Sequence, residues 1–426
     1  MKVFVTDGNQ RSALAITRSL GRRGISVLVG EQEPVALASS SRYCAGHVTY
    51  PSPYRDPGGF QEFLVDFVRR ERVDVVVPVT DVTTSSICLR QDALRPHTAI
   101  AAPTLEAFDC MTDKSRALQA AALSGIPIPR TLIAEGAAGL RRIVDQVQYP
   151  AVVKPVRSRI LTGRGWVGTG VHYAASEADL WRLYDETDYL SSHPSLIQAR
   201  IVGPGVGLFA LFDRGRLLTT FAHRRLREKP PAGGVSVLCE SVPVDPQLRD
   251  DAVRLLGPLG WHGVAMLEYK RDRDTGGRFL IEVNGRFWGS LQLAVDAGVD
   301  FPFLSCQVAL GLPPDVPQTY RVGVRNRWLF GDLDHLLSRL GRTRGDLSLP
   351  DHAPSRLRAV LDFIRCTRPG VGDQVLSGDD PGPFLHEAGQ YARSLSASIG
   401  RRLRGPVLRG RVGGLRLARA AMRSWR

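Results

Sequence analysis

The sequence predicts an α/β protein made of several domains, and three observations support that prediction. Short apolar stretches alternate with helical ones over the first hundred residues, which is typical of β-α-β units and implies a small parallel sheet. A later section, from about residue 195, is richer in strands. The chain has 426 residues, of which 43% are hydrophobic and 23% charged, so it is long enough for two to four packed domains.

The N-terminal domain is expected to alternate strands and helices, over residues 3–5, 11–22, 26–29, 60–70 and 73–79. Asp7-Gly8 closes the first strand, and the turn after it resembles a nucleotide-binding turn. Because it has only one of the three glycines of a dinucleotide-binding fingerprint, a turn without a ligand is the favoured interpretation. A nicotinamide-dependent oxidoreductase, with Glu31 as the acidic residue that meets the ribose, is the alternative.

Three further sections follow this domain. The second is expected to contain a helix that begins near Lys114 and stops at Gly125, then two strands, a glycine-rich loop and a returning strand. The third is expected to contain six strands and to end with helices near 287–297 and 301–310, while the last section has a mixed pattern. The predicted domains are 1–104, 105–190, 191–317 and 318–426.

The charge of the chain lies mostly in its tail. The formal net charge is +14, but Ala388 to Arg426 contain ten Arg and no Asp or Glu, so the first 387 residues carry 14 − 10 = +4. We therefore expect no nucleic acid partner. Glycines and a proline interrupt the apolar residues of this tail, which favours a solvated segment; contact with an anionic membrane or an acidic partner is the alternative.

Other features of the composition predict a reduced, cytoplasmic protein. The six cysteines are scattered without a CxxC pair, which argues against a zinc site or a disulfide framework. The first apolar stretch is too short for a signal peptide, and no apolar run reaches bilayer length.

A metal-binding face is predicted in the third section. Strand alternation along residues 281–286 places Glu282, Asn284 and Arg286 on one face. Glu268 ends another apolar run and would lie beside Glu282 if the two runs pair as antiparallel strands. Hard divalent ions such as Mg²⁺ take oxygen ligands and share them with substrate phosphates. The hypothesis is a magnesium-nucleotide site.

Phosphate contacts are predicted in the second section. Lys154 ends an apolar strand just before a loop with four glycines in eight residues, 163–170, and backbone amides in such a loop suit phosphate oxygens. Lys114, at the start of a helix, is a second candidate, although a helix-start Asp-Lys pair explains it equally well. The strand that contains Gln198 ends at a Gly-Pro-Gly turn, where free backbone groups could pair with an adenine edge.

The order of these parts resembles the ATP-grasp superfamily, and within it the carboxylate-amine ligases related to biotin carboxylase and carbamoyl phosphate synthetase domains. The resemblance covers about residues 1–312. It implies a Rossmann-like N-terminal domain, a two-lobed ATP-grasp fold and a C-terminal extension. It further implies that ATP binds at Lys114, Lys154, Gly163, Gly165, Gly168, Gln198 and Ile201, and that the metal ligands are Glu268, Glu282 and Asn284.

The resemblance implies an enzyme that uses ATP and Mg²⁺, with Mn²⁺ as an alternative ion. Such a ligase activates a small carboxylic acid as an acyl phosphate, joins it to a small amine, and releases ADP and phosphate. Arg286, Arg224 and His223 are the expected catalytic residues, the last two as part of a cationic patch, for which a solvated basic hairpin is the alternative. Carboxylation, small-molecule phosphorylation or ATP binding without catalysis are the alternatives, and an oligomer is compatible with the sequence.

Overall fold

The N-terminal domain contains a parallel sheet, as the alternating pattern predicts. The computed structural model describes residues 1–163, 165–231, 233–347, 349, 353–366 and 370–404. The sheet has the order β3-β2-β1-β4-β5, and every pairing in it is parallel. Its elements are β1 (Lys2–Val5), α1 (Arg11–Arg22), β2 (Ser26–Glu31), η1 (Ala38–Ser40), β3 (Gly46–Thr49), α2 (Pro57–Glu71), β4 (Val75–Val77), α3 (Asp81–Leu89), α4 (Gln91–Leu94), β5 (Ala99–Ile100) and α5 (Leu105–Thr112).

A second, smaller lobe contains a sheet of order β10-β7-β11-β6. The glycine-rich segment that the sequence suggested to be a loop forms a separate two-stranded hairpin, β8–β9. The elements of this lobe are α6 (Lys114–Leu123), β6 (Thr131–Glu135), α7 (Gly136–Arg141), η2 (Val144–Gln146), β7 (Ala151–Pro155), β8 (Arg159–Thr162), β9 (Gly165–Gly168), β10 (His172–Ala174), α8 (Glu177–Glu186), α9 (Asp188–Ser192) and β11 (Pro194–Ala199).

The largest sheet has seven strands, in the order β16-β15-β12-β13-β14-β17-β18. The boundary expected after residue 317 does not divide this sheet, because β17 and β18 extend it at the edge opposite β16. The elements are β12 (Gly205–Asp213), β13 (Arg216–Lys229), β14 (Val235–Val242), α10 (Pro246–Leu256), β15 (Gly263–Arg271), β16 (Arg278–Asn284), α11 (Leu291–Ala297), α12 (Phe301–Ala309), β17 (Arg325–Arg327), α13 (Leu329–Gly341), α14 (Arg356–Arg365), β18 (Val371–Asp373) and α15 (Gly382–Arg404).

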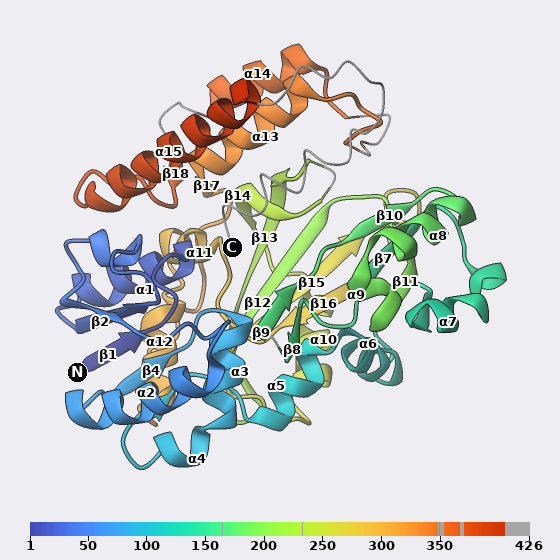
Figure 1. The fold of residues 1–426 in the computed structure, drawn as a ribbon. Coiled ribbons are helices and arrows are strands. Elements are labelled where there is room, and N and C mark those ends of the chain that lie inside the picture. Colours follow the sequence, from blue (N-terminus) through green and yellow to red (C-terminus); the bar gives the residue numbers. More distant parts are fainter. Residues whose placement is uncertain (164, 232, 348, 350–352, 367–369, 405–426) are drawn as a thin grey trace.

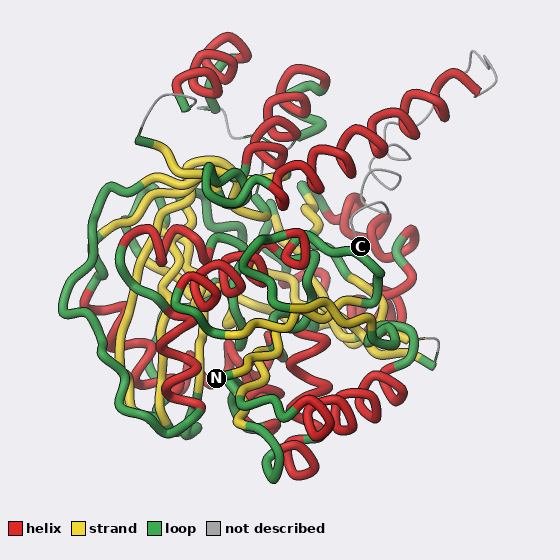
Figure 2. Tube along the Cα trace, turned by 90° about the vertical axis from the view of Figure 1, so that its left-hand side faces the viewer, coloured by secondary structure: helices red, strands yellow, loops and turns green. Residues whose placement is uncertain are grey.

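Figure 1 shows the three parts and places α13, α14 and α15 together above the large sheet. In the view turned by 90°, most helices lie on the outside and the strands between them (Figure 2). No helix of the described residues is both long and apolar enough to cross a membrane.

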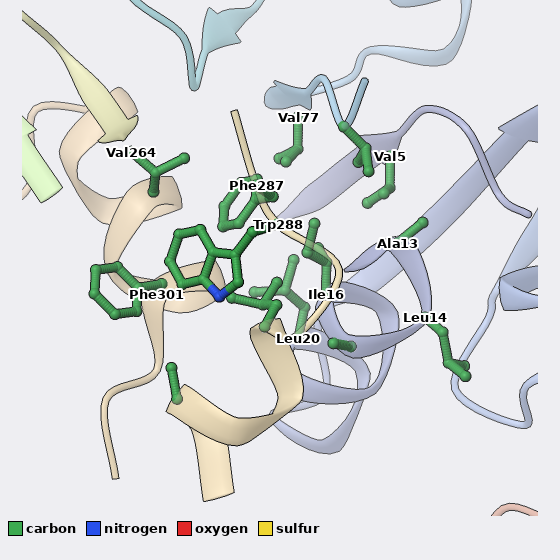
Figure 3. Packing of buried hydrophobic residues seen from close by; sticks show 14 of the residues in the cluster. Val5, Ala13, Leu14, Ile16, Leu20, Val77, Val264, Phe287, Trp288 and Phe301 are labelled. Carbon is green, nitrogen blue, oxygen red and sulfur yellow. The ribbon is translucent and has the colours of Figure 1, made fainter. Parts of the chain in front are cut away.

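An apolar core joins the N-terminal domain to the large sheet. Ile16 and Leu20 of α1 are fully buried and belong to the same cluster as Trp288 and Phe301, which are 2% and 0% exposed (Figure 3). Side chains of this size contribute about 3–5 kcal/mol each to stability when buried. This core therefore fixes the N-terminal domain against the strands that contain the metal-face residues.

The C-terminal extension is attached to the N-terminal domain by a buried ion pair. Arg18 of α1 and Asp380 are 2% and 1% exposed, and the Arg18 Nε lies 2.8 Å from the Asp380 carboxylate. The carboxylate also accepts hydrogen bonds from Ser41 Oγ and the Arg42 amide. Such a fully partnered charge pair fixes the position of the extension. Most of the arginine-rich tail, from residue 405, lies outside the described residues.

Candidate active site

The carboxylates of the predicted metal face lie side by side. β15 and β16 pair antiparallel with Glu268 opposite Glu282 and Met266 opposite Asn284, which confirms the pairing expected from the sequence. The Asn284 amide nitrogen lies 3.4 Å from Glu268 Oε1 and 3.3 Å from Glu282 Oε1. Directly opposed residues of an antiparallel pair share one face, so the three side chains form one polar group.

Both predicted lysines reach this group from the smaller lobe. Lys114 begins α6, and its Nζ lies 3.6 Å from Glu282 Oε2 and donates to Ser158 Oγ at 2.6 Å. Lys154 of β7 is 4% exposed and donates to the Ile281 carbonyl at 3.1 Å. The structure thus brings two cations to two carboxylates, and each cation is more than a hundred residues from either carboxylate in the chain.

Burial and charge shift the pKa values of this network in opposite directions. Burial lowers the pKa of Lys154 to about 8, while Glu282 opposes the fall and Lys114 adds to it. Burial alone would raise the pKa of Glu282, but the charges of Lys114 and Lys154 outweigh it and lower that pKa to about 2. Glu268 has a raised pKa, because burial outweighs its attraction to Arg225. Glu282 is therefore the firmly ionised member of the pair.

Arg286 connects the metal face to the N-terminal domain. Its Nε lies 3.0 Å from Asp81 Oδ1, at the first residue of α3, and its Nη2 donates to Asn284 Oδ1 at 3.1 Å. Asp81 was not identified from the sequence, because 205 positions separate it from Arg286 and no local pattern marks the contact. The ion pair places the N-terminal domain at one wall of the site.

The prediction that Arg224 belongs to the site is wrong. Arg224 lies opposite Glu240 in the sheet, its Nη2 is 2.5 Å from that carboxylate, and its side chain is half exposed. The neighbouring Arg225 points to the other face, and its Nη2 lies 2.5 Å from Glu268 Oε2. Strand alternation counted from His223 would have selected Arg225.

His223 lies on the metal face but is not the expected cation. It is opposite Gly207, which is in turn opposite Glu268, so the three residues form one row across the sheet. The ring is 1% exposed, and burial together with the Arg225 charge lowers its pKa to about 3. The imidazole is therefore neutral at physiological pH, and its Nε2 has no hydrogen-bond partner among the described residues.

The glycine-rich hairpin covers a pocket at this site. The Trp166 amide donates to the Tyr54 carbonyl of the N-terminal domain at 3.0 Å. Gly165 has φ +98, and a Cβ there would lie 2.3 Å from the same carbonyl oxygen, so the approach requires glycine. The pocket is lined by Lys114, Glu282, Asn284, Asp81, Arg159 and Trp166, among others. Gly163 and Gly168 lie at the turn and at the end of β9.

Gln198, which the sequence predicts to lie at the adenine contact, is on the same face of the sheet as Lys154. Gln198 pairs with Val152, two residues before Lys154 in β7, and its side chain is buried and donates to Thr131 Oγ1 at 2.8 Å. The side-chain amide nitrogen of Gln198 is therefore already hydrogen-bonded within the protein. The peptide N–H and C=O of Ile201, just after β11, have no hydrogen-bond partner within the described ranges, as an adenine contact through backbone groups requires.

The donor set fits a hard divalent ion. Within the described residues no three His, Cys, Asp or Glu side chains form a metal-binding group. Two partly buried carboxylates and an amide nevertheless suit Mg²⁺, which takes its remaining ligands from water and phosphate. As placed, Asn284 turns its NH₂ to the carboxylates, so its oxygen would face an ion only after a half-turn of the amide.

The oxidoreductase alternative is not supported by the N-terminal turn. Both oxygens of Glu31 accept backbone hydrogen bonds, from the Asn9 and Gln32 amides at 3.0 and 2.8 Å, and the side chain is 8% exposed. Burial and the nearby Asp7 raise its pKa to about 7. The Glu31 carboxylate thus stabilises the turn through backbone hydrogen bonds, and it does not line an open site for a ribose.

Comparison with known proteins identifies the fold. Residues 194–330 match the model of a family described as ATP-grasp in the biosynthetic pathway with Ter operon. No curated protein of similar sequence was found.

Three solved structures, all under 25% identical, have a similar fold. Biotin carboxylase from Campylobacter jejuni, in a β,γ-ATP complex, has a TM-score of 0.61 and 15% identity, over 76% of this chain and 74% of that chain. The biotin carboxylase domain of 2-oxoglutarate carboxylase from Hydrogenobacter thermophilus, with MgADP, ADP and bicarbonate, has a TM-score of 0.61 and 16% identity, over 76% of this chain and 73% of that chain. An N5-carboxyaminoimidazole ribonucleotide synthetase in an ADP complex has a TM-score of 0.59 and 14% identity, over 80% of this chain and 85% of that chain.

The chain has the ATP-grasp fold, and the resemblance predicted from the sequence is confirmed. The matched family covers the strands of Glu268 and Glu282 as well as β13, which contains His223 and Arg225. The roles of the individual site residues remain predictions that follow from their geometry.

Proposed function

We propose that this protein is an ATP-dependent ligase that activates a small carboxylic acid as an acyl phosphate and joins it to a small amine. The observation that carries the proposal is the buried network in which Lys114 and Lys154 face the Glu268–Glu282 pair beneath a docked hairpin. A network of cations and oxygen ligands suits phosphoryl transfer, which depends on positioning and charge neutralisation.

The proposed reaction has two steps. An oxygen of the substrate carboxylate attacks the γ-phosphorus of ATP, the bond to the β-phosphate oxygen breaks, and ADP leaves. The amine then attacks the acyl carbon, the bond to the phosphate oxygen breaks, phosphate leaves, and the amine loses a proton to solvent. Lys114, Lys154 and Arg286 stabilise the charge on the transferred group.

Mg²⁺, or Mn²⁺ in its place, would be held by Glu268, Glu282 and Asn284. When bound, such an ion neutralises phosphate charge and orients the phosphates for in-line transfer. The ionised Glu282 provides the anionic anchor, because its lowered pKa keeps it charged throughout the physiological range.

The hairpin β8–β9 protects the acyl phosphate from water. Its contacts with Tyr54, through the Trp166 amide and the Arg159 guanidinium, hold it closed against the N-terminal domain. An acyl phosphate hydrolyses readily, so exclusion of water keeps ATP consumption coupled to product.

A hydroxylamine trap tests this proposal. The purified protein is incubated with Mg-ATP, hydroxylamine and a panel of carboxylic acids, and both ADP and acyl hydroxamate are measured. We expect at least one acid for which the two products appear in equal amounts. ADP release without hydroxamate from any acid would instead favour carboxylation, phosphorylation of another group or simple hydrolysis.

A pair of matched variants links the activity to the site. Glu282→Gln removes the ionised carboxylate with little change in shape, and we expect turnover to fall by about 10²–10³-fold. Glu62→Gln makes the same change at an exposed position of α2 and should leave turnover unchanged. Wild-type turnover in Glu282→Gln would overturn the assignment of the site.

A further inference from the structure

The C-terminal helices expose a row of aliphatic side chains. Leu357, Leu361 and Ile364 of α14 are 70%, 42% and 55% exposed, and their spacing of four and three residues places them on one helical face. Leu337 and Leu340 of the adjacent α13 are 47% and 40% exposed. Large apolar side chains grouped in this way are uncommon on a surface that faces only water.

The opposite side of α14 packs against the rest of the protein. Val360 and Phe363 are half-buried, and the Arg327 guanidinium of β17 lies 5.3 Å from the Phe363 ring centre. The exposed row is therefore not the face that holds α14 to the rest of the protein, and its leucines contribute little to folding.

Arginines gather at the same end of the helix pair. Burial and then the charges of Arg344 and Arg356 lower the pKa of Arg339, so these three side chains lie close enough to repel one another. Arg339 and Arg356 donate to the backbone carbonyls of Pro354 and Arg342, and neither forms an ion pair with a carboxylate in the described ranges. Arg339 is only 6% exposed, whereas Arg356 is exposed and directly precedes Leu357, so the positive charge of Arg356 borders the aliphatic row.

Three acidic residues of this region pair with cations of the body of the protein, whereas Asp362 of α14 pairs with Arg358 and Arg365 on the same helix. Asp332 pairs with Arg227 at 2.6 Å, Asp334 pairs with Lys229, and Asp380 with Arg18 at 2.8 Å. Residues 337–365 contain six arginines and three aspartates, a net +3, while most of the positive charge of the whole extension lies in the tail after residue 387. The outer side of the extension thus combines positive charge with exposed aliphatic groups.

We propose that the face formed by Leu337, Leu340, Leu357, Leu361 and Ile364, with its bordering arginines, docks onto an anionic lipid surface. A bilayer interface supplies both parts of the match, since headgroup phosphates pair with arginines while the leucines enter the acyl boundary. Arginine also suits this border because its aliphatic stem can lie along apolar surface while its guanidinium stays at the headgroups.

The place of this face in the fold is compatible with catalysis at a membrane. α13 packs on β13 and β14, towards one edge of the large sheet, whereas Glu268 and Glu282 lie at the other edge, on β15 and β16. Docking would therefore leave the candidate active site open to substrates. The inference is independent of the proposed ligase activity.

Vesicle flotation of the full-length protein tests the proposal. Wild-type protein should float with phosphatidylcholine vesicles that contain phosphatidylglycerol and remain unbound with phosphatidylcholine alone. The double variant Leu357→Gln, Leu361→Gln should lose about tenfold or more in partitioning. Arg356→Gln should lose about fivefold at low salt and much less at high salt.

The control is Leu123→Gln, which removes a leucine that is 84% exposed at the end of α6 and should float like the wild type. Equal flotation of the double variant and the wild type would assign binding to the arginine-rich tail alone and overturn the proposal. So would a wild type that binds neither kind of vesicle. A leucine-dependent dimer in size-exclusion chromatography without lipid would also overturn it, by showing that the face binds a second copy.

Discussion

The candidate active site and the C-terminal helix pair are both rich in charge, but they use it differently. At the site, Lys114 and Lys154 lie against Glu282 and Glu268 in a largely buried network, and the charges of this network shift the pKa of Lys154 and of Glu282. In the helix pair, Arg339 and Arg356 donate to carbonyls, beside leucines that face outward.

This difference separates charges that are paired inside the protein, as a reaction site requires, from charges that are exposed and available for contact with another surface. A buried charge is costly unless it is paired, so a buried network persists because its partners and its ligand compensate that cost. An exposed arginine such as Arg356 costs little and does not require an acidic partner within the chain. Substitutions should therefore have large effects on turnover in the first region and small effects on folding in the second.

The largest effect is expected at Lys154. Lys154→Met removes a buried cation that faces the phosphates, and turnover should fall by about 10²–10³-fold. Lys154→Arg retains the charge and should recover part of this loss. Steady-state assays of ADP release measure both variants, and equal activity of Lys154→Met and wild type would contradict the network.

The same lysine predicts a pH dependence. Because burial lowers its pKa to about 8, Lys154 is protonated at pH 7 and loses its charge as the pH rises through 8. The kcat/KM for ATP, which reports the free enzyme, should then fall by up to about tenfold per pH unit above that value. The fall should be absent near pH 8 in Lys154→Arg, since a guanidinium stays charged. A flat profile in the wild type would show that Lys154 does not contact ATP in its charged form.

The next effect separates two neighbouring arginines. Arg225→Gln leaves the partly buried Glu268 without its cation and should lower turnover by about tenfold to a hundredfold. Arg224→Gln removes a half-exposed pair with Glu240 on the other face and should change turnover by less than about twofold. The opposite ranking would mean that the face assignment of β13 is wrong.

A smaller effect is expected in the hairpin. Gly165→Ala places a Cβ against the Tyr54 carbonyl at a positive φ, at a cost of about 1–3 kcal/mol to the docked position. ADP release should then exceed hydroxamate formation, because water reaches the acyl phosphate. Gly163→Ala meets no atom within 4 Å and should keep the two products equal. Tight coupling in Gly165→Ala would show that docking does not exclude water.

The smallest effect belongs to the helix pair. Leu357→Gln and Leu361→Gln should each change the free energy of unfolding by less than about 0.5 kcal/mol, since both side chains are exposed. Their turnover should equal that of the wild type. Denaturant unfolding measures the first quantity, and a loss above 2 kcal/mol would show that the leucines support the fold.

Much of the site could be predicted because its signals are local. Glu282 and Asn284 are two residues apart on β16, Arg286 follows two residues after its end, and Lys154 lies near the end of a strand that precedes a glycine-rich segment, so alternation and turn chemistry place them. Asp81 could not be found in this way, because its contact with Arg286 depends on how two domains pack.

Other features failed for specific physical reasons. Arg224 and Arg225 are adjacent in a run of charges, and alternation shows only that they face opposite sides; the pairing of β13 with β12 shows which of the two faces carries Glu268. Residues 163–170 suggested a loop because four glycines disfavour regular strands, yet their close approach to Tyr54 is what glycine allows. The strands of the C-terminal extension could not be predicted from the sequence, because β17 and β18 have three residues each and depend on an existing sheet edge.

The most direct test of the central claim is the Mg²⁺ dependence of ATP binding, measured by titration calorimetry on the wild type and on Glu282→Gln. Wild-type protein should bind ATP at one site and more tightly as Mg²⁺ is added, because the Glu268–Glu282 pair holds the ion that bridges to phosphate. In Glu282→Gln this gain should disappear, while Lys114 and Lys154 still retain ATP. An equal Mg²⁺ gain in both proteins, or no ATP binding by the wild type, would contradict the account.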